Sequence, residues 1–308
     1  WLKHRAKDEP FCLLCQFKAP HSPWESAPRF AEEFANVSIP IPPAFAELPR
    51  NVPDAVRKTQ MSVAQMNFRN RGVAADLPDT ERKHANLQAF VRNYYRVLRG
   101  VDENIGRVLD FLDEAKLAAD TLVIYTSDNG FFLGELGLFD KRLMYEPSIR
   151  VPMLLRWPAA VQPDQVDDEH MVLNVDVAPT VLDVAGADIP ASMHGRSCKP
   201  LLGGDEVRWR DAFLYEFYEY PAVHCVRKHR GVRTRRWKLI HFWEQPEEVA
   251  LYDLENDPHE LVNLAGRREH AQRIRALRQR LQELRRETGD VDPPGYVAPK
   301  LNPGRCPV

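Results

Sequence analysis

Polar residues follow two apolar runs of this sequence, at the points where buried strands are expected to end. The run "TLVIYTS" is followed by Asp128 and Asn129, and the run "FCLLCQF" is followed by Lys18 and, three residues later, by His21. Ligands of open α/β sheets lie beyond the carboxyl ends of the strands. If the two strands are neighbours, these four side chains converge in one crevice.

Together with Lys141, these residues could hold and cleave an ester of a tetrahedral oxyanion. Asp128 supplies a hard anionic oxygen and Asn129 a neutral carbonyl oxygen, which suit Ca²⁺ or Mg²⁺ better than zinc. Lys141 is a compact positive charge for an anionic oxygen. His21 could donate a proton to a leaving oxygen or a hydrogen bond to an anion. A cation, Lys141 and His21 would together stabilise the charge that develops on the transferred group.

Each of these residues also has an ordinary interpretation. The triplet Asp128–Asn129–Gly130 is typical of a plain turn, and by spacing alone that interpretation is favoured. A single histidine such as His21 is more often a loop residue, and a single lysine such as Lys141 is more often solvated. Spacing alone therefore leaves both interpretations open.

The elements that would position these residues are predicted from apolar periodicity. From Thr80 onward, apolar residues recur every three or four positions, which predicts an amphipathic helix; they are Phe90, Tyr94, Val97, Val101, Ile105, Val108 and Leu112. This helix leads into the strand that precedes Asp128, as in half of a βαβ unit. A further strand is predicted over 149–158, followed by a helix that Asp176 and Pro179 open and Gly186 ends.

The sequence changes character near residue 205. The stretches "AFLYEFYEY", "GVRTRRWKLIHFW" and "VALYDLENDP" alternate or are rich in aromatic and β-branched residues, which predicts antiparallel strands. A final helix is predicted over 263–287. We therefore expect two units, residues 1–205 with an α/β sheet and residues 206–308 with an antiparallel sheet and a helix.

Composition excludes several classes of protein. The chain has 308 residues, 28% of them charged, and a net charge of -2, so no long-range attraction toward nucleic acid is expected. No apolar run approaches the ~20 residues that a membrane-spanning helix needs. The sequence does not indicate an oligomeric state.

Cys12 and Cys15 form a C-x-x-C motif. It could be a redox pair or half of a zinc site. Since no second pair stands at zinc spacing, we favour two buried residues of a strand. The five cysteines, an odd number, argue against a complete disulfide framework.

The stretch "YTSDNGFFLGELGLFDKRLMYEPSIRVP" closely resembles the sulfatase family of the alkaline-phosphatase-like superfamily. "FKAPHSPW", "LNVDVAPTVLDVAGADIPASMHGRSCKPLL", "GVRTRRWKLIHF" and "LYDLENDPHE" resemble other segments of that family, so the resemblance spans nearly the whole chain. It implies an α/β fold with a mixed, mostly parallel sheet flanked by helices. A smaller C-terminal α+β subdomain with an antiparallel sheet is implied as well.

The resemblance also implies roles for individual residues. Asp128 and Asn129 would be metal ligands, normally for Ca²⁺, and Lys141 and His21 would bind the sulfate group as catalytic residues. Lys18 is a candidate for substrate binding because it lies beside His21.

His224 and His229 could reach the substrate pocket from the C-terminal subdomain. Surface polarity around a strand is an equally good interpretation of these two histidines.

Two departures from the family pattern matter. Leu136 stands where related sulfatases commonly have histidine, and a leucine can neither bind an anion nor move a proton. The C/S-x-P-x-R motif, whose cysteine or serine is converted to the formylglycine nucleophile, is not in these 308 residues. The paired aspartates that the family has near the start of its fold, where they complete the metal site, are not there either. We therefore expect that Trp1 begins partway through a sulfatase and that this fragment alone is inactive.

The leading hypothesis is a metal-dependent sulfuric ester hydrolase that acts on a sulfated small molecule or glycan, with a formylglycine outside this chain. A phosphodiesterase or phosphonate hydrolase of the same superfamily is the second hypothesis, because sulfate and phosphate esters share their geometry. A non-catalytic protein that binds anions or glycans is the third, favoured by Leu136. The family also implies an exported, periplasmic, extracellular or lysosomal location.

Overall fold

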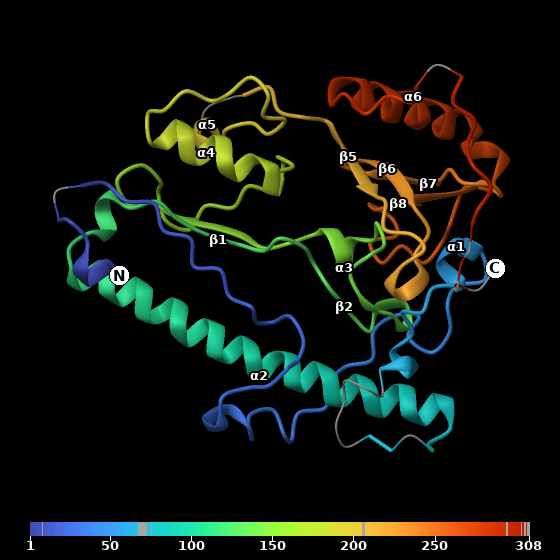
Figure 1. Cartoon of the computed structure of the whole chain (residues 1–308), viewed down its shortest axis with the longest axis horizontal. Coiled ribbons are helices and arrows are strands. Elements are labelled where there is room, and N and C mark those ends of the chain that lie inside the picture. The colour runs from blue at the N-terminus through green and yellow to red at the C-terminus, as the bar shows by residue number, and fades with distance from the viewer. Residues whose placement is uncertain are drawn as a thin grey trace.

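The computed structural model describes residues 1–7, 9–66, 73–74, 76–204, 207–293, 295–302, 304 and 306. The long helix α2 (Asp79–Glu114) runs along one side of the molecule, and the ribbon of β1 (Val123–Thr126) and β4 (Met153–Arg156) lies beside it. A four-stranded sheet stands at the other end and carries α6 (Ala271–Glu287) on its far face (Figure 1). The boundary predicted near residue 205 lies outside the described residues.

Helix α2 confirms the predicted apolar stripe. Phe90, Val97, Val101 and Leu112 are buried along it, because residues three and four apart share one face of a helix. Phe90 belongs to an apolar cluster with Trp24 and Phe139, which attaches the helix to the chain on either side of the predicted site. None of the described helices combines the length and the apolar character that crossing a bilayer requires.

Two short strand pairs frame the predicted site. Strands β1 and β4 pair antiparallel, with Thr126 opposite Met153. Strands β2 (Phe132–Leu133) and β3 (Phe139–Asp140) form a second antiparallel pair. The α/β class is confirmed, but every pairing between named strands of the described residues is antiparallel, in contrast to the mostly parallel sheet that we expected.

The strand predicted for "FCLLCQF" is a correction. Residues 10–17 have no regular secondary structure and pair with no described strand. Cys12 and Cys15 are exposed, as are Leu13 and Leu14, so the interpretation of buried strand cysteines is wrong. A strand needs a neighbour for its backbone N–H and C=O groups, and none of the described residues offers one here.

The C-terminal antiparallel sheet is confirmed. Its order is β5 (Ala212–Phe217), β6 (His229–Thr234), β7 (Trp237–Phe242) and β8 (Glu248–Asp253). Leu277, Leu281 and Leu284 of α6 pack on it, as their spacing predicted.

The final helix begins later than the predicted residue 263. Asn263 is used differently, because its Oδ1 accepts hydrogen bonds from the backbone N–H groups of Leu251 and Ala265. The backbone N–H of Leu264 also bonds to the Leu251 carbonyl. Residues 263–265 are therefore held by hydrogen bonds around Leu251 of strand β8 instead of starting the helix.

The remaining helices are short. They are α1 (Asp54–Arg57), α3 (Glu146–Ile149), α4 (Val177–Val184) and α5 (Lys199–Leu202). Asp176 and Gly186 flank α4, as the sequence predicted; Gly186 has a positive φ of 70°, a conformation that glycine adopts at low cost.

One apolar cluster joins the segment between β3 and α3 to the C-terminal sheet. Leu143, Met144 and Tyr145 are fully buried against Phe242 and Tyr252. The hydroxyl groups of Tyr145 and Tyr252 lie 2.7 Å apart, so this contact is also satisfied by a hydrogen bond. The segment that carries Lys141 is thus packed directly on the sheet.

Gly231 of β6 tests how tightly this contact is packed. A Cβ atom at Gly231 would lie 2.3 Å from the Met144 sulfur and 2.4 Å from the backbone oxygen of Leu239. We predict that Gly231→Ala lowers the free energy of unfolding by about 1–3 kcal/mol, as overpacking does. Urea unfolding measures the change.

The control is Gly266→Ala, because no heavy atom lies within 4 Å of a Cβ built there. We expect its effect to stay within about 0.5 kcal/mol. Equal losses in the two variants would contradict close packing at Gly231.

Candidate active site

Asp128, Asn129 and Lys141 line one large open cavity of about 2740 Å³. Its wall includes parts of the β1–β4 ribbon, α3, the segment before α4 and strand β5. The cavity thus lies between the two predicted units. The acid–amide pair and Lys141 thus lie on the wall of the same cavity. Their roles as metal ligands and sulfate-binding residue stay predictions.

The turn after β1 holds Asp128 in place from two sides. The Asp128 Oδ1 accepts a hydrogen bond from the Asn129 backbone N–H at 2.9 Å. The amide of Asn174 donates to the Asp128 backbone oxygen at 2.9 Å. Asn174 is itself anchored, because nearby Asp176 is fully buried and forms a bidentate ion pair with Arg210 at 2.5 and 2.7 Å. Such fork geometry fixes orientation as well as charge.

Asp128 and Asn129 offer the type of oxygen ligand that a hard cation prefers, but two residues are too few to complete its coordination. They bring carboxylate and amide oxygens, whereas Ca²⁺ takes about 6–8 oxygen ligands. Within the described ranges, no group of three or more His, Cys, Asp or Glu side chains is arranged to hold a metal. These two residues would therefore form one side of a metal site.

Ser148 of α3 connects the two halves of the candidate site. Its hydroxyl donates to the Lys141 backbone oxygen at 2.5 Å, and its backbone oxygen accepts from the Gly130 N–H at 2.8 Å. Gly130 must be glycine here, because a Cβ would lie 2.2 Å from the Pro147 oxygen. Among the described carboxylates, none forms an ion pair with Lys141, so its ammonium group is available to an anion.

Asp140 organises the other side of Lys141. Its Oδ1 accepts hydrogen bonds from the Lys141 backbone N–H at 2.7 Å and from the Arg142 guanidinium. Its Oδ2 lies 3.0 Å from the Nε2 of His224, whose Nδ1 contacts the Gln60 carbonyl at 2.9 Å. Asp140 and His224 have positive φ angles of 78° and 66°, a sparsely populated conformation that clusters at functional sites.

Burial alone would raise the pKa of the Asp140 carboxyl. The contact with His224, the Arg142 charge and the Lys141 N–H outweigh burial and hold this pKa well below its usual range. Asp140 is therefore ionised at neutral pH and binds its three partners as a carboxylate.

Lys18 and His21 lie side by side and are not among the residues that line this cavity. The predicted convergence of His21 with Asp128 stays a prediction. The Nδ1 of His21 lies 3.1 Å from the Lys18 Nζ and 2.8 Å from the Ser22 carbonyl. Trp24 bonds to the Pro20 carbonyl and packs against Phe90 of helix α2 and against Phe131, which follows the Asn129–Gly130 turn.

His229 is a second correction. Its side chain is fully buried, stacked on Tyr215 and packed against Phe217 and Phe242. Its Nδ1 lies 2.8 Å from the Arg227 carbonyl, which assigns the proton to Nδ1. A ring with no exposed surface cannot touch a substrate, so His229 is a core residue of the sheet. His224 is 8% exposed and does not line the cavity either.

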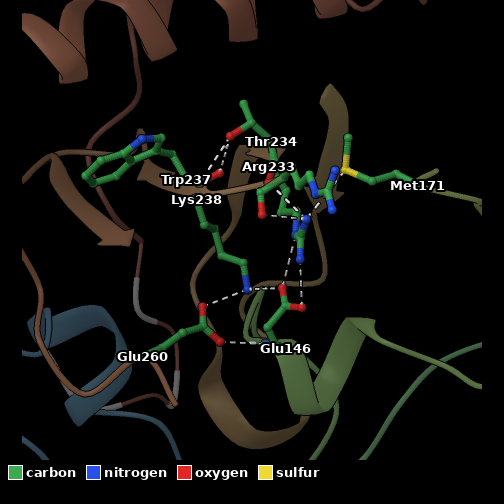
Figure 2. Close-up of polar contacts among 8 residues, drawn as sticks. Glu146, Met171, Arg233, Thr234, Trp237, Lys238 and Glu260 are labelled. Carbon is green, nitrogen blue, oxygen red and sulfur yellow. Dashed lines mark hydrogen bonds and ion pairs between the residues drawn. The ribbon is translucent and has the colours of Figure 1, made fainter. Parts of the chain in front are cut away.

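Sequence reasoning missed the residues that position Lys141. Asp140 does not stand out in "LFDKRLMYEP". Its position just before Lys141 and Arg142 is only a weak indication of a structural ion pair. Ser148 gave no signal although Lys141 is only seven residues away, and Lys238 gave none because Glu146 and Glu260 are distant in the sequence. Figure 2 shows Lys238 between Glu146 of α3 and Glu260, an ion cluster that no local pattern reveals.

Comparisons with known proteins agree with this geometry. The sulfatase family model matches residues 1–187, and the model for the C-terminal part of N-sulphoglucosamine sulphohydrolase matches residues 134–287. The chain therefore belongs to the sulfatase family, an alkaline-phosphatase-like class of protein, as its sequence motifs implied.

Particular relatives refine this assignment. The chain is 35% identical, over 95% of its length, to an N-acetylglucosamine-6-O-sulfatase of Bacteroides thetaiotaomicron, and it spans 61% of the length of that relative. A solved structure in complex with its substrate D-glucosamine-2-N,6-O-disulfate superposes with a TM-score of 0.85 at 34% identity, covering 95% of this chain and 68% of that one. A phosphonate monoester hydrolase from Silicibacter pomeroyi gives a TM-score of 0.73 at 25% identity, covering 88% and 55%.

Asp140→Asn tests the anchoring of Lys141 and His224. The pKa of Asp140 is lowered on folding, so its stabilising contribution is present above its unfolded pKa of about 4 and is lost as pH falls below it. We expect the variant to lose about 3–5 kcal/mol of unfolding free energy at pH 7, as when a buried ion pair loses one partner. Urea titrations at pH 7, 5 and 3.5 measure the difference in unfolding free energy between the parent protein and the variant. We expect this difference to decrease only at pH 3.5. If this difference is the same at pH 3.5 as at pH 7, the charge of the Asp140 carboxylate contributes nothing to stability.

His229 predicts a second pH dependence. Burial lowers the pKa of His229 to about 4, although its contact with the Arg227 carbonyl acts in the opposite direction. Below the pKa of about 6.5 that this histidine has in the unfolded chain, the unfolded chain binds a proton at His229 and the folded chain does not. Unfolding free energy is therefore lost as pH falls from 6.5 toward 4.

Between pH 7 and pH 4.5 the parent protein should lose unfolding free energy because His229 stays neutral in the folded state. At 1.36 kcal/mol per pH unit, we expect the loss in His229→Phe to be smaller by about 2–3 kcal/mol. Urea unfolding at both pH values measures this difference. His259→Phe, at an exposed histidine, is the control and should follow the parent. An unchanged pH dependence in His229→Phe would refute neutral burial of this ring.

Proposed function

We propose that the protein carrying this chain is a sulfuric ester hydrolase that removes sulfate from a sulfated carbohydrate. The observation that carries the proposal is the shared cavity of Asp128, Asn129 and Lys141 within a sulfatase fold. The 6-O-sulfate of an N-substituted glucosamine is the best-supported substrate. Both a curated relative and a solved neighbour are described with glucosamine sulfates.

Each residue contributes one part of the chemistry. Asp128 and Asn129 would hold a divalent cation, normally Ca²⁺, which polarises a sulfate oxygen when bound. The Lys141 ammonium would neutralise charge on the sulfate group as the ester bond breaks. The nucleophile, a formylglycine, would come from outside these 308 residues.

Further parts of the proposal have less structural support. Lys18 and His21 stay candidates for sulfate contacts, and His224 stays a candidate for substrate binding through its contact with Asp140. Residues 1–205 and 206–308 are proposed as the two units. An exported location is supported by the disulfide between Cys225 and Cys306, because disulfides persist in oxidising compartments.

A phosphonate monoester hydrolase is the second candidate. The neighbour from Silicibacter pomeroyi supports it, because its fold covers 88% of this chain. Sulfate and phosphonate esters share a tetrahedral centre and differ in charge, so paired substrates distinguish the two activities.

The test uses the protein expressed from the whole reading frame that carries this chain. We expect hydrolysis of D-glucosamine-2-N,6-O-disulfate in the presence of Ca²⁺, with phenylphosphonate as the competing substrate. Lys141→Ala should lower kcat/KM by about 10²–10³, the usual cost of removing one charge-stabilising group. Asp128→Asn should weaken Ca²⁺ binding and so raise the Ca²⁺ concentration needed for half-maximal activity.

Lys199→Ala is the matched control, since this exposed lysine pairs with Asp183 and does not line the cavity. It should keep the parent activity. Preferred cleavage of phenylphosphonate would favour the second candidate. Binding of the sulfated sugar without turnover would favour a non-catalytic protein, for which Leu136 is the sequence signal.

A further inference from the structure

Lys238 of β7 is a fully buried cation that bridges two parts of the molecule. Its Nζ lies 2.8 Å from a carboxylate oxygen of Glu146, in α3, and 2.6 Å from one of Glu260, after β8. The side chains of Lys238 and Glu260 are 0% and 1% exposed. Figure 2 shows the three side chains pointing toward one another between the sheet and α3.

The same cluster also holds the backbone of α3. The second oxygen of Glu260 accepts a hydrogen bond from the Glu146 N–H at 2.6 Å, at the first residue of the helix. Arg233 of β6 contacts the Glu146 carboxylate at 3.2 Å. The C-terminal sheet therefore holds Glu146 by both its side chain and its main chain.

Helix α3 in turn contacts both halves of the candidate site. Ser148 donates its hydroxyl proton to the Lys141 carbonyl and accepts the Gly130 N–H, as described above. Only one residue separates Glu146 from Ser148 in the chain. A continuous path of hydrogen bonds and one helical turn thus runs from Lys238 to Lys141 and to the turn that carries Asn129.

The electrostatics of the cluster argue against a purely stabilising role. Burial by itself would raise the pKa of both carboxyls. For Glu146 the charges of Lys238 and Arg233 outweigh burial and lower its pKa to about 2, whereas for Glu260 burial prevails and its pKa is raised. Buried ion clusters often stabilise a protein no better than apolar side chains of similar volume. Their directed contacts, however, fix one geometry.

We propose that Lys238, Glu260 and Glu146 are positioning residues, which set α3 so that Ser148 holds Lys141 and the Asn129–Gly130 turn at a fixed separation. This inference rests on the proposed function, because it assigns these residues to the site of Lys141. It makes the C-terminal sheet a support of the catalytic geometry and not only of the fold.

The experiment compares three variants in the protein from the whole reading frame. Ser148→Ala removes the hydrogen bond to Lys141 and leaves the ion cluster intact. Lys238→Met removes the shared cation. The double variant Lys238→Met/Glu260→Met also removes the carboxylate that would otherwise be buried without a cation, while Glu146 keeps Arg233 as its partner. Arg236→Met is the control, because Arg236 pairs with Asp253 and Glu255 and with no described residue of α3.

Three quantities are measured for each variant: the melting temperature, kcat and KM on the disulfated sugar, and amide exchange at Gly130. Ser148→Ala should lower kcat about tenfold, with KM and melting temperature near the parent values. Small displacements of a catalytic group have effects of this size or larger. Lys238→Met should lower kcat at least tenfold, speed Gly130 exchange about tenfold and reduce the melting temperature.

The double variant separates positioning from stability. We expect its melting temperature to recover while kcat and Gly130 exchange stay altered. If all three quantities recover together, or if Arg236→Met changes them equally, the positioning role is wrong. If the parent protein hydrolyses no sulfate ester, the proposed function fails, whereas Gly130 exchange still decides whether Lys238 holds α3.

Discussion

The burial of Lys238 between two carboxylates is the constraint on which the candidate site depends. A cation without water must keep its partners within hydrogen-bonding distance, because leaving it unpaired costs several kcal/mol. One partner belongs to α3 and the other follows β8. If the sheet and the segment after Lys141 separated, Lys238 or one of its carboxylate partners would be exposed to solvent or left buried without a counter-charge.

Asp140 applies the same principle closer to the site. A single ionised carboxylate faces the backbone of Lys141, the guanidinium of Arg142 and the ring of His224. The site side chains come from short segments with little regular structure, which would be mobile if isolated. Directed contacts with buried charges replace the rigidity that long strands would otherwise give.

The sequence predicted the elements with strong periodicity. These elements are helix α2, strand β1, the four C-terminal strands and the apolar face of α6. They can be predicted from nearby residues, because an element that buries one face shows a regular apolar pattern. Prediction failed where the outcome depended on distant partners. Residues 10–17 have strand composition but no described neighbour, and His229 faces the core although its flanking residues are polar. Motif resemblance singled out Asp128, Asn129 and Lys141 as candidates. It did not reveal their contacts with Asn174 and Ser148, which depend on how the chain folds back.

The disulfide between Cys225 and Cys306 has a consequence for the durability of the protein. It joins residues 81 apart and lies next to His224, so most of the C-terminal sheet and all of α6 are enclosed in a covalent ring. A protease that cut one exposed loop inside this ring would open it without releasing a fragment. The sheet that supports α3 could then survive such a nick in surroundings rich in peptidases.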